Sequence, residues 1–312
     1  MPPPRPAPDR LPLREKLCYG FGDLASCLYW QTFMMYLIYY YTDVFGISAL
    51  AAAVLLGPSR FIDAFFDPLV GLVADRTETR WGKYRPFLLW VCVPFAAVGV
   101  LAFTTPGAAT ARHLDAALGG GVRFALGLLA RGGGGLAHLG RSLHWSWLAG
   151  ASGGLASGAD ALRHEVAGRL VWALLTYNGL MLLYTTINIP YTAMLGVMSP
   201  DPRERTSLSS IKFVGAYLGG NILISFGLLK LVQVLGGADA AAGWQRAFLV
   251  IGAVAIACFV ITFANTRERV RPPQAQRTSV GRDLRDLVTN GPWLVLLAAT
   301  LAFILFVAAR SS

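Results

Sequence analysis

The chain is poor in charged residues. Asp, Glu, Lys and Arg make up 14% of its 312 residues, against about 25% in soluble domains, while 55% of the residues are hydrophobic and the mean hydropathy is +0.52. This balance excludes intrinsic disorder and argues against an ordinary soluble domain. The long apolar runs instead indicate a protein that crosses a membrane several times. The net charge of +10 therefore bears on orientation in the bilayer, and we expect no nucleic-acid partner.

The sequence also lacks the motifs of several kinds of chemistry. It has no phosphate-binding loop or nucleophile motif, so we expect neither an ATP-driven pump nor an enzyme, and no bound cofactor. No signal-peptide core precedes Leu17, and residues 1–16 are interpreted as a cytoplasmic tail. No CxxC occurs, which excludes the usual zinc and redox motifs and favours small buried residues for the four cysteines, Cys18, Cys27, Cys92 and Cys258.

Seven apolar segments are long enough to cross a bilayer, which takes about 20 helical residues. They are 17–41, 49–74, 86–105, 170–197, 211–234, 246–265 and 292–309. Lys and Arg concentrate in the N-terminal tail, between the second and third segments, after the fourth and in 266–291, whereas the connections after the first and fifth segments have neither. By the positive-inside rule the N-terminus is cytoplasmic, and we expect a multi-pass protein of the bacterial inner (plasma) membrane.

Residues 107–168 separate the spans of 17–106 from those of 169–265 and do not fit this pattern. The segment is rich in Gly, Ala and Arg, and the topology places it outside the cytoplasm, where long loops escape the charge rule. We expect its glycine runs, Gly119–Gly121 and Gly132–Gly135, to break any span. Fragments such as VRFALGLLA could form short amphipathic helices on the membrane surface. All four histidines lie here, at spacings that match no metal-ligand motif.

The second apolar segment contains two acids, Asp63 and Asp67, four residues apart and therefore on one helix face. One acid at the bilayer centre costs about 2.5–3.5 kcal/mol on insertion scales, and two ionised acids repel each other. A cation or proton between their oxygens would relieve both costs, because hard cations prefer oxygen ligands. The alternative is a structural ion-pair cluster with Arg60.

The fourth segment offers neutral oxygens three residues apart, from Thr185 and Asn188, beside a helix-loosening Pro190. They could complete a cation shell or bind a polar substrate, or they could be hydrogen-bonding contacts between helices. The first segment combines an intramembrane Asp23 with Trp30 and Gln31, which suits a sugar: aromatic faces stack on C–H groups and polar groups bind hydroxyls. The tyrosines at its end are interpreted as an interfacial belt.

Two cytoplasmic connections mix charges of both signs. One is Asp75–Pro86 and the other is Asp201–Thr206, and together they could form a latch that breaks and re-forms as helices move. The alternative, positive-inside anchoring, explains their basic residues but not the interleaved acids. The latch residues would be Asp75, Arg80, Lys83, Arg85, Arg203 and Arg205.

Four stretches resemble the glycoside-pentoside-hexuronide:cation symporters, the melibiose-permease-like branch of the major facilitator superfamily. They are KLCYGFGDLAS with YYYTDVFG, RFIDAFFDPLVGLVADRTETRWGKYRPFLLW, LLYTTINIPYTAMLG and DPRERTSLSSIKF. The resemblance implies an all-α fold of two six-helix halves, alternating access, and co-transport of a sugar with sodium or a proton. This chain then comprises the N-terminal half and a seventh helix.

The resemblance also assigns residues. Cation binding falls to Asp63, Asp67, Thr185 and Asn188. Substrate binding falls to Asp23, Cys27, Trp30, Gln31, Tyr184, Asn188, Thr192 and Lys212. Asn188 and Cys27 stand where melibiose permease has acids, so the choice of sodium or proton stays open and sugar binding at Cys27 is weakened.

Two departures from the family accompany these matches. Most of 107–168 is an insertion where the family has a short loop, and the chain ends where helix seven would close. We expect a fragment that inserts into the membrane without transporting on its own. The alternative is a non-transporting or decayed transporter that acts as a membrane interaction scaffold.

Overall fold

The computed structural model of the chain describes residues 10–142, 167–270, 289–296, 298–300 and 302. The chain forms two compact units, Met1–Val270 and Arg271–Ser312. In the second unit the described residues are helical at 289, 291–296, 298–300 and 302, and the rest of the span expected at 292–309 lies outside the described residues.

The first unit is a bundle of long helices, and its described residues contain no strand, which confirms the expected all-α fold. Its long helices include α2 (Ala49–Arg76), α3 (Arg85–Ala102), α7 (Ala167–Met198) and α10 (Ala240–Asn265). Two further helices contain a π-helical part. The first is α1 (Leu13–Tyr39), which continues into η1 (Tyr40–Val44), and the second is α8 (Pro202–Ala216), which continues through η3 (Tyr217–Gly227) into α9 (Leu228–Gly236).

Local sequence fixes where several of these helices begin. The first N–H groups of a helix lack intrahelical acceptors, and a side-chain oxygen just before the helix can satisfy one of them. Ser48 accepts from the Ala51 amide at the start of α2, Asp201 from the Arg203 amide at α8, and Asp239 from the Ala242 amide at α10. The cap of α2 coincides with the start of its apolar segment, whereas those of α8 and α10 begin the helices several residues before the apolar segments at 211 and 246.

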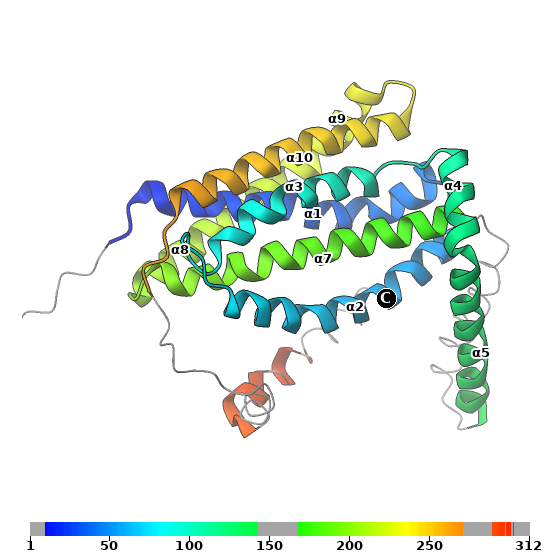
Figure 1. The fold of residues 1–312 in the computed structure, drawn as a ribbon, viewed down its shortest axis with the longest axis horizontal. Helices are drawn as coiled ribbons and strands as arrows, with labels where there is room; N and C mark the ends of the chain where they lie inside the picture. The colour runs from blue at the N-terminus through cyan, green and yellow to red at the C-terminus, as the bar shows by residue number, and fades with distance from the viewer. Residues whose placement is uncertain (1–9, 143–166, 271–288, 297, 301, 303–312) are drawn as a thin grey trace, which may run out of the picture. The chain divides into compact units, whose positions relative to one another are not determined.

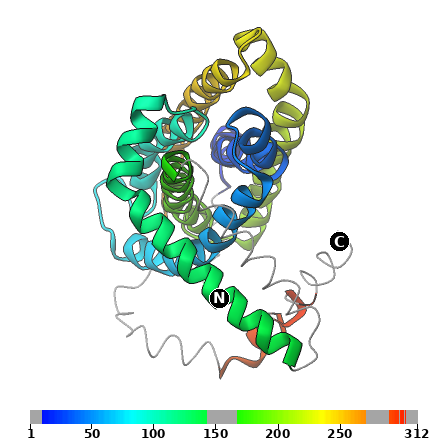
Figure 2. The same ribbon diagram turned by 90° about the vertical axis from the view of Figure 1, so that its right-hand side faces the viewer.

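The long helices of the first unit run side by side (Figure 1). α10 packs against both α3 and α1, α7 packs against both α3 and α2, and α8 with η3 packs along α1. Figure 2 shows this order around the bundle from one end. As a result α1, α2, α7 and α8, which carry the candidate site residues, lie on the same side of the α3–α10 pair.

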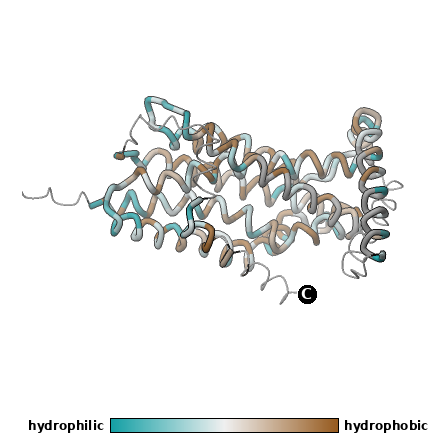
Figure 3. Tube along the Cα trace, turned by 90° about the horizontal axis from the view of Figure 1, so that it is seen from below, coloured by the Kyte–Doolittle hydropathy of each residue, from teal (hydrophilic) through white to brown (hydrophobic). Residues whose placement is uncertain are grey.

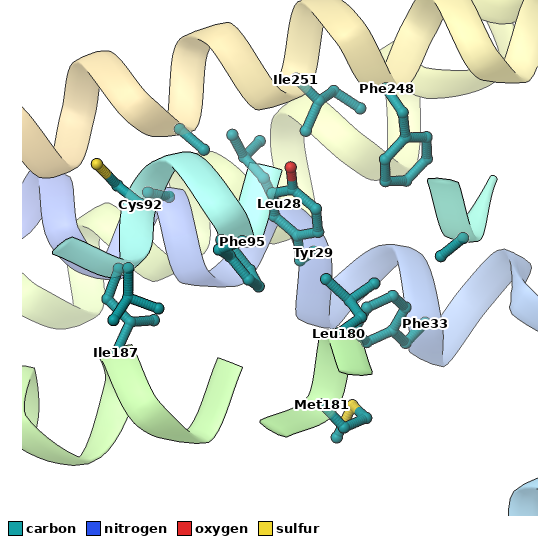
Figure 4. Packing of buried hydrophobic residues seen from close by; sticks show 14 of the residues in the cluster. Leu28, Tyr29, Phe33, Cys92, Phe95, Leu180, Met181, Ile187, Phe248 and Ile251 are labelled. Carbon is teal, nitrogen blue, oxygen red and sulfur yellow. The ribbon is translucent and has the colours of Figure 1, made fainter. Parts of the chain in front are cut away.

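Aromatic side chains fill the centre of the bundle. Phe103 and Phe248 stack with ring centroids 3.7 Å apart, and Tyr29 packs on Phe95 at 4.3 Å. Figure 4 shows Tyr29 and Phe33 of α1, Phe95 of α3, Leu180 of α7 and Phe248 of α10 meeting in this core. Cys18, Cys92 and Cys258 are buried and Cys27 is half-buried, all as free thiols.

The outer faces of the long helices are apolar, with exposed side chains such as Trp90, Phe213 and Val234. Four helices of the described part are long and apolar enough to cross a membrane: Arg85–Ala102, Gly168–Met198, Pro202–Gly236 and Ala240–Asn265. α1 and α2, also expected to span, carry acids along their length. Hydrophilic segments gather at the end of the bundle where α1 begins (Figure 3). This surface fits surrounding lipid and confirms a multi-pass membrane protein.

Residues 108–142 form more continuous helix than the short surface helices expected, although no part of them is among the described helices long and apolar enough to cross a membrane. They form a helical stretch of α4 (Ala108–Leu114), the π-helical η2 (Asp115–Gly119) and α5 (Gly120–Ser142), and the helix continues through Gly132–Gly135. The glycine runs do not break it because glycine weakens a helix but, unlike proline, still donates its backbone hydrogen bond. α4 and η2 pack against α7.

Glycines bring α8 and η3 close to α1. A Cβ atom at Gly215 would overlap the carbonyl oxygen of Gly20, and one at Gly219 would lie 2.5 Å from the carbonyl oxygen of Leu24. Small residues at such crossings let two backbones approach in a membrane bundle. The close contact determines how far Lys212, less than one turn before Gly215, can reach toward α1.

Candidate functional site

Two of the expected cation ligands touch each other across α2 and α7. The Thr185 hydroxyl donates a hydrogen bond of 3.1 Å to Oδ1 of Asp67. Thr185 is buried, whereas Asp67 is exposed and this is the one hydrogen bond of its carboxylate found in the described part. The Asp63 side chain lies outside the described residues, so its pairing with Asp67 stays a prediction.

Asn188 follows one turn along α7. Its Oδ1 atom is buried and has no hydrogen-bond partner among the described residues. An unpaired buried oxygen costs about 1–3 kcal/mol, and a ligand that supplies a proton donor or a cation would remove that cost. Asn188 also lines an open pocket of about 400 Å³ together with Ile189, Thr192 and Ala193.

An ion pair joins α8 to α1 beside this pocket. Lys212 Nζ lies 3.9 Å from Asp23 Oδ1, donates to Thr192 Oγ1 at 3.3 Å, and stands 5.4 Å from the centre of the Tyr191 ring. Asp23 is buried and Lys212 half-buried. The lysine therefore contacts an acid, a hydroxyl and an aromatic face on two other helices.

Aromatic and small polar side chains continue the site along α1 and α7. Trp30 and Tyr184 stack with centroids 5.6 Å apart and an interplanar angle of 22°. Cys27 and Gln31 lie against Gly220 of η3, where a Cβ atom would be 3.6 and 3.3 Å from their Cβ atoms. We call Asp23, Trp30, Tyr184, Asn188, Thr192 and Lys212 the polar face.

The sequence analysis missed the contact that holds this face together. The Tyr19 hydroxyl donates to the Tyr191 carbonyl at 3.2 Å, the Tyr191 hydroxyl donates to the Tyr19 carbonyl at 2.8 Å, and the rings stack at 4.7 Å. A Cβ atom at Gly22 would overlap the Tyr191 ring. Gly20 and Gly22, on either side of Phe21, were the feature of the sequence that could have predicted a bulky side chain packed against α1 here.

In the part of the chain that the structure describes, the charged connection after α2 forms no pair with 201–206. Within the described residues its partner is Glu268, whose carboxylate accepts the backbone amides of Lys83 and Tyr84 at 2.8 Å each and of Arg85 at 3.0 Å. This capping of α3 is favourable because a helix N-terminus carries partial positive charge. Glu268 was not among the expected latch residues.

The other expected latch residues divide in two. Asp75 binds Lys83 at 3.1 Å and accepts from the Tyr84 hydroxyl at 2.8 Å; burial and this acid raise the pKa of Tyr84 above its ordinary value. Arg85 donates to the Phe263 carbonyl at 2.6 Å. By contrast, Arg80 lies 4.6 Å from the Trp81 ring centre, and the side chains of Arg203 and Arg205 form no ion pair in the part of the chain described.

Residues outside the expected set complete this end of the bundle. Glu15 binds Arg269 through two contacts of 2.7 Å, and Glu204, in the second charged connection, binds Lys16 at 2.7 Å. In the described residues the first connection therefore pairs with Glu268 after α10 and the second with Lys16 of the N-terminal segment, and a latch directly between the two connections stays a prediction. The reason is position: α1 and the end of α10 lie between the two connections in the packing.

Comparison with known proteins places the chain among transporters. A family described as MFS/sugar transport protein matches residues 18–128 and 156–312, which leaves out only 129–155 of the segment expected as an insertion. Three relatives illustrate the match. They are the inner membrane symporter YicJ of Escherichia coli (33% identity over 96% of this chain and 53% of that protein), the putative glycoside/cation symporter YagG of the same organism (34%, 93% and 50%), and the isoprimeverose transporter of Lactiplantibacillus pentosus (30%, 96% and 52%). The chain spans about half the length of these relatives.

Proposed function

This chain belongs to the MFS/sugar transport protein family, among the glycoside-pentoside-hexuronide:cation symporters, and on that premise we propose that it serves cation-coupled sugar transport by alternating access. It would bind a monovalent cation, sodium or a proton, and one side of a sugar or glycoside. The proposed setting is the bacterial inner membrane with the N-terminus in the cytoplasm, which the basic connections support.

The observation that carries the proposal is the contact between Thr185 and Asp67. It brings an intramembrane carboxylate of α2 against the helix that also bears Tyr184 and Asn188 of the polar face. Intramembrane acids default to a functional role because an idle one is costly. The carboxylate and hydroxyl oxygens would bind the cation, with Asp63 and Asn188 as the further proposed ligands.

Coupling follows from the order of residues on α7. Thr185 faces the acid, Tyr184 beside it belongs to the polar face, and Asn188, less than one turn on, is proposed to serve both the cation and the sugar. A cation that takes the Asp67 carboxylate competes with the Thr185 hydrogen bond. Occupancy of the cation site therefore changes how α7 sits on α2, and with it the geometry offered to the sugar.

Glycoside binding in different cations tests the proposal. The purified chain in lipid nanodiscs is titrated with labelled p-nitrophenyl glycosides in sodium, in choline, and over a range of pH, with sucrose as an unrelated sugar. We expect glycoside affinity to rise at least tenfold with sodium or with protonation. Equal affinity in all conditions, or no glycoside binding in any of them, would contradict symport.

A further inference from the structure

The helix α5 lies at the end of the bundle where α7 begins, and none of the proposed transport residues lies on it. A Cβ atom at Gly168 would overlap the Ala111 carbonyl oxygen, so glycine lets α4 lie against the first turn of α7. η2 also packs on α7, and α5 then runs across the direction of the long helices (Figures 1 and 2). Its 23 residues make it about 34 Å long, and most of its described residues are exposed. The bundle therefore leaves α5 largely uncovered.

α5 differs from the long helices in how its apolar residues are distributed. It has enough residues to cross a bilayer, but it is not among the described helices that are apolar enough to do so. Its apolar and polar residues separate onto opposite faces more strongly than those of α1, α2, α3, α7 or α10. A crossing helix has apolar surroundings on all sides, whereas a helix at a membrane surface needs one apolar and one polar face. The distribution in α5 is typical of the second kind.

The level at which α5 leaves the bundle fits a membrane surface. The Trp172 indole of α7 donates to the carbonyls of Leu101 at 3.2 Å and Thr104 at 3.0 Å, where α3 ends. One turn earlier on α7, Arg169 donates to the Phe45 carbonyl at 3.4 Å. Tryptophan and arginine at the ends of membrane helices are typical of the headgroup level, because their apolar parts and polar tips suit the two sides of that boundary. α4, η2 and α5 follow α3 at this level.

The charged residues of this segment are almost all basic. Residues 108–142 contain four arginines and a single acid: Arg112, Arg123, Arg131 and Arg141 against Asp115. Arg123 binds Asp115 at 2.9 Å, so these two charges balance each other. The other three arginines are exposed and form no ion pair within the described part of the chain. The surface around α5 therefore carries positive charge that the described residues do not neutralise, and it suits an anionic partner.

We propose that α5 is a membrane-surface helix that binds anionic phospholipid in the leaflet at this end of the bundle. Phe124 and Leu128, one turn apart and 69% and 53% exposed, enter the boundary between headgroups and acyl chains. Arg131 follows Leu128 by less than one turn, so its stem lies beside the apolar surface while its guanidinium reaches the phosphates. Arg131 and Arg141 bind these phosphates through paired N–H donors. The lipid contacts hold α4 and η2 on α7.

A fluorophore on α5 tests the proposal directly. An environment-sensitive dye is attached at Leu128→Cys in the full chain, in nanodiscs that each hold one chain; the native cysteines are buried or half-buried, and the unsubstituted chain gives the background. We expect the emission to move to shorter wavelength as phosphatidylglycerol is added to phosphatidylcholine, and high salt to reverse the change. A dye at Gly134→Cys, where a Cβ atom meets nothing within 4 Å, should stay in water. An emission at Leu128→Cys that is the same in both lipids would overturn the proposal.

Arginine variants locate the binding. Each basic residue near an anionic surface contributes about a fivefold factor in affinity, so we expect the double variant Arg131→Gln, Arg141→Gln to bind phosphatidylglycerol at least fivefold more weakly. The matching pair of lysine substitutions keeps the charges and should retain most of the affinity. Arg203→Gln, an exposed arginine at the charged end of the bundle, is the control and should leave the dye response unchanged. An unchanged response in the folded double glutamine variant would overturn the assignment to these arginines.

The same samples distinguish lipid from a second copy of the chain. A change in emission that appears only in discs holding two chains would overturn the proposal and identify a neighbouring copy as the partner of α5. A change in discs holding one chain supports lipid, and it needs no arginine variant to be observed. Glycoside binding and transport play no part in these measurements, so failure here leaves the proposed symport untouched, and failure of symport leaves this inference untouched.

Discussion

The two polar regions of the first unit contrast in how completely the chain satisfies them. At the charged end, formed by the start of α1, the connections 77–84 and 199–201 and residues 266–269, Glu268 accepts three backbone amides and Glu15 binds Arg269 twice at 2.7 Å. On the polar face the Asp23–Lys212 distance is 3.9 Å and Asn188 Oδ1 has no described partner.

The difference separates structural charges from ligand-binding ones. Short, multiple bonds within the chain leave the charged end little capacity for a ligand, and its groups hold helices together. On the polar face, and at the nearby Asp67, the contacts within the chain are single or long. Their oxygen atoms and polar hydrogens can therefore still bind a ligand. Changes at the charged end should therefore lower stability, and changes at the polar face should mainly lower ligand affinity.

The largest expected effect is at Glu268. Glu268→Ala leaves three amides at the start of α3 without their acceptor, and hydrogen bonds to a charged group contribute about 1.5–3 kcal/mol each, so we expect the free energy of unfolding to fall by about 3 kcal/mol. Unfolding in mild detergent measures it. Glu78→Ala, an exposed acid of the same connection, is the control and should change stability by less than about 0.5 kcal/mol. Equal effects of the two variants would contradict a structural role for Glu268.

The next effect is at the crossing of α8 and α1. Gly215→Ala puts a methyl group onto the Gly20 carbonyl, and overpacking of this kind costs about 1–3 kcal/mol. The variant should also lower glycoside affinity, because it moves Lys212 away from Asp23. Gly196→Ala is the matched control, since a Cβ atom there meets nothing within 4 Å. Unaltered stability and binding in Gly215→Ala would show that the crossing is looser than described.

A smaller effect is expected at Trp30. Trp30→Leu removes the ring stacked on Tyr184, and such aromatic contacts are worth about 0.5–1.5 kcal/mol, or roughly a twofold to tenfold loss of glycoside affinity. Trp90→Leu, on the exposed outer side of α3, should leave affinity unchanged. If the two tryptophan variants bind glycosides equally well, Trp30 does not face the sugar.

The smallest effect is expected at Arg203. Its exposed side chain forms no ion pair in the described part of the chain, so Arg203→Gln should change the free energy of unfolding by less than about 0.5 kcal/mol. Thermal unfolding beside Glu268→Ala gives the comparison. A loss of unfolding free energy close to that of Glu268→Ala would contradict this expectation and would support a latch between the two charged connections.

The sequence predicted what depends on one helix at a time. Apolar runs predicted the long helices, and spacing placed Asp63 with Asp67, and Thr185 with Asn188, on shared faces, because helical periodicity is local. The family resemblance assigned Asp67 and Thr185 to the cation site and Asp23 and Lys212 to the substrate site, but their contacts come from the structure.

Contacts between distant segments could not be predicted in the same way. Glu268 lies 185 positions from Lys83. The sequence around either residue does not predict that an acid after α10 caps α3. The reciprocal bonds of Tyr19 and Tyr191 likewise depend on how α1 meets α7. The helix through Gly132–Gly135 was missed because glycine runs lower helix propensity without forbidding the hydrogen bonds.

The central claim is that Asp67 belongs to the cation site that controls sugar binding. Its most direct test is the glycoside affinity of Asp67→Asn as a function of sodium concentration and of pH, with Asp43→Asn as control. In the wild-type chain we expect affinity to rise with sodium, or to fall as rising pH removes a coupling proton, and in Asp67→Asn to depend on neither. The same ion dependence in Asp67→Asn as in the wild-type chain would contradict the claim.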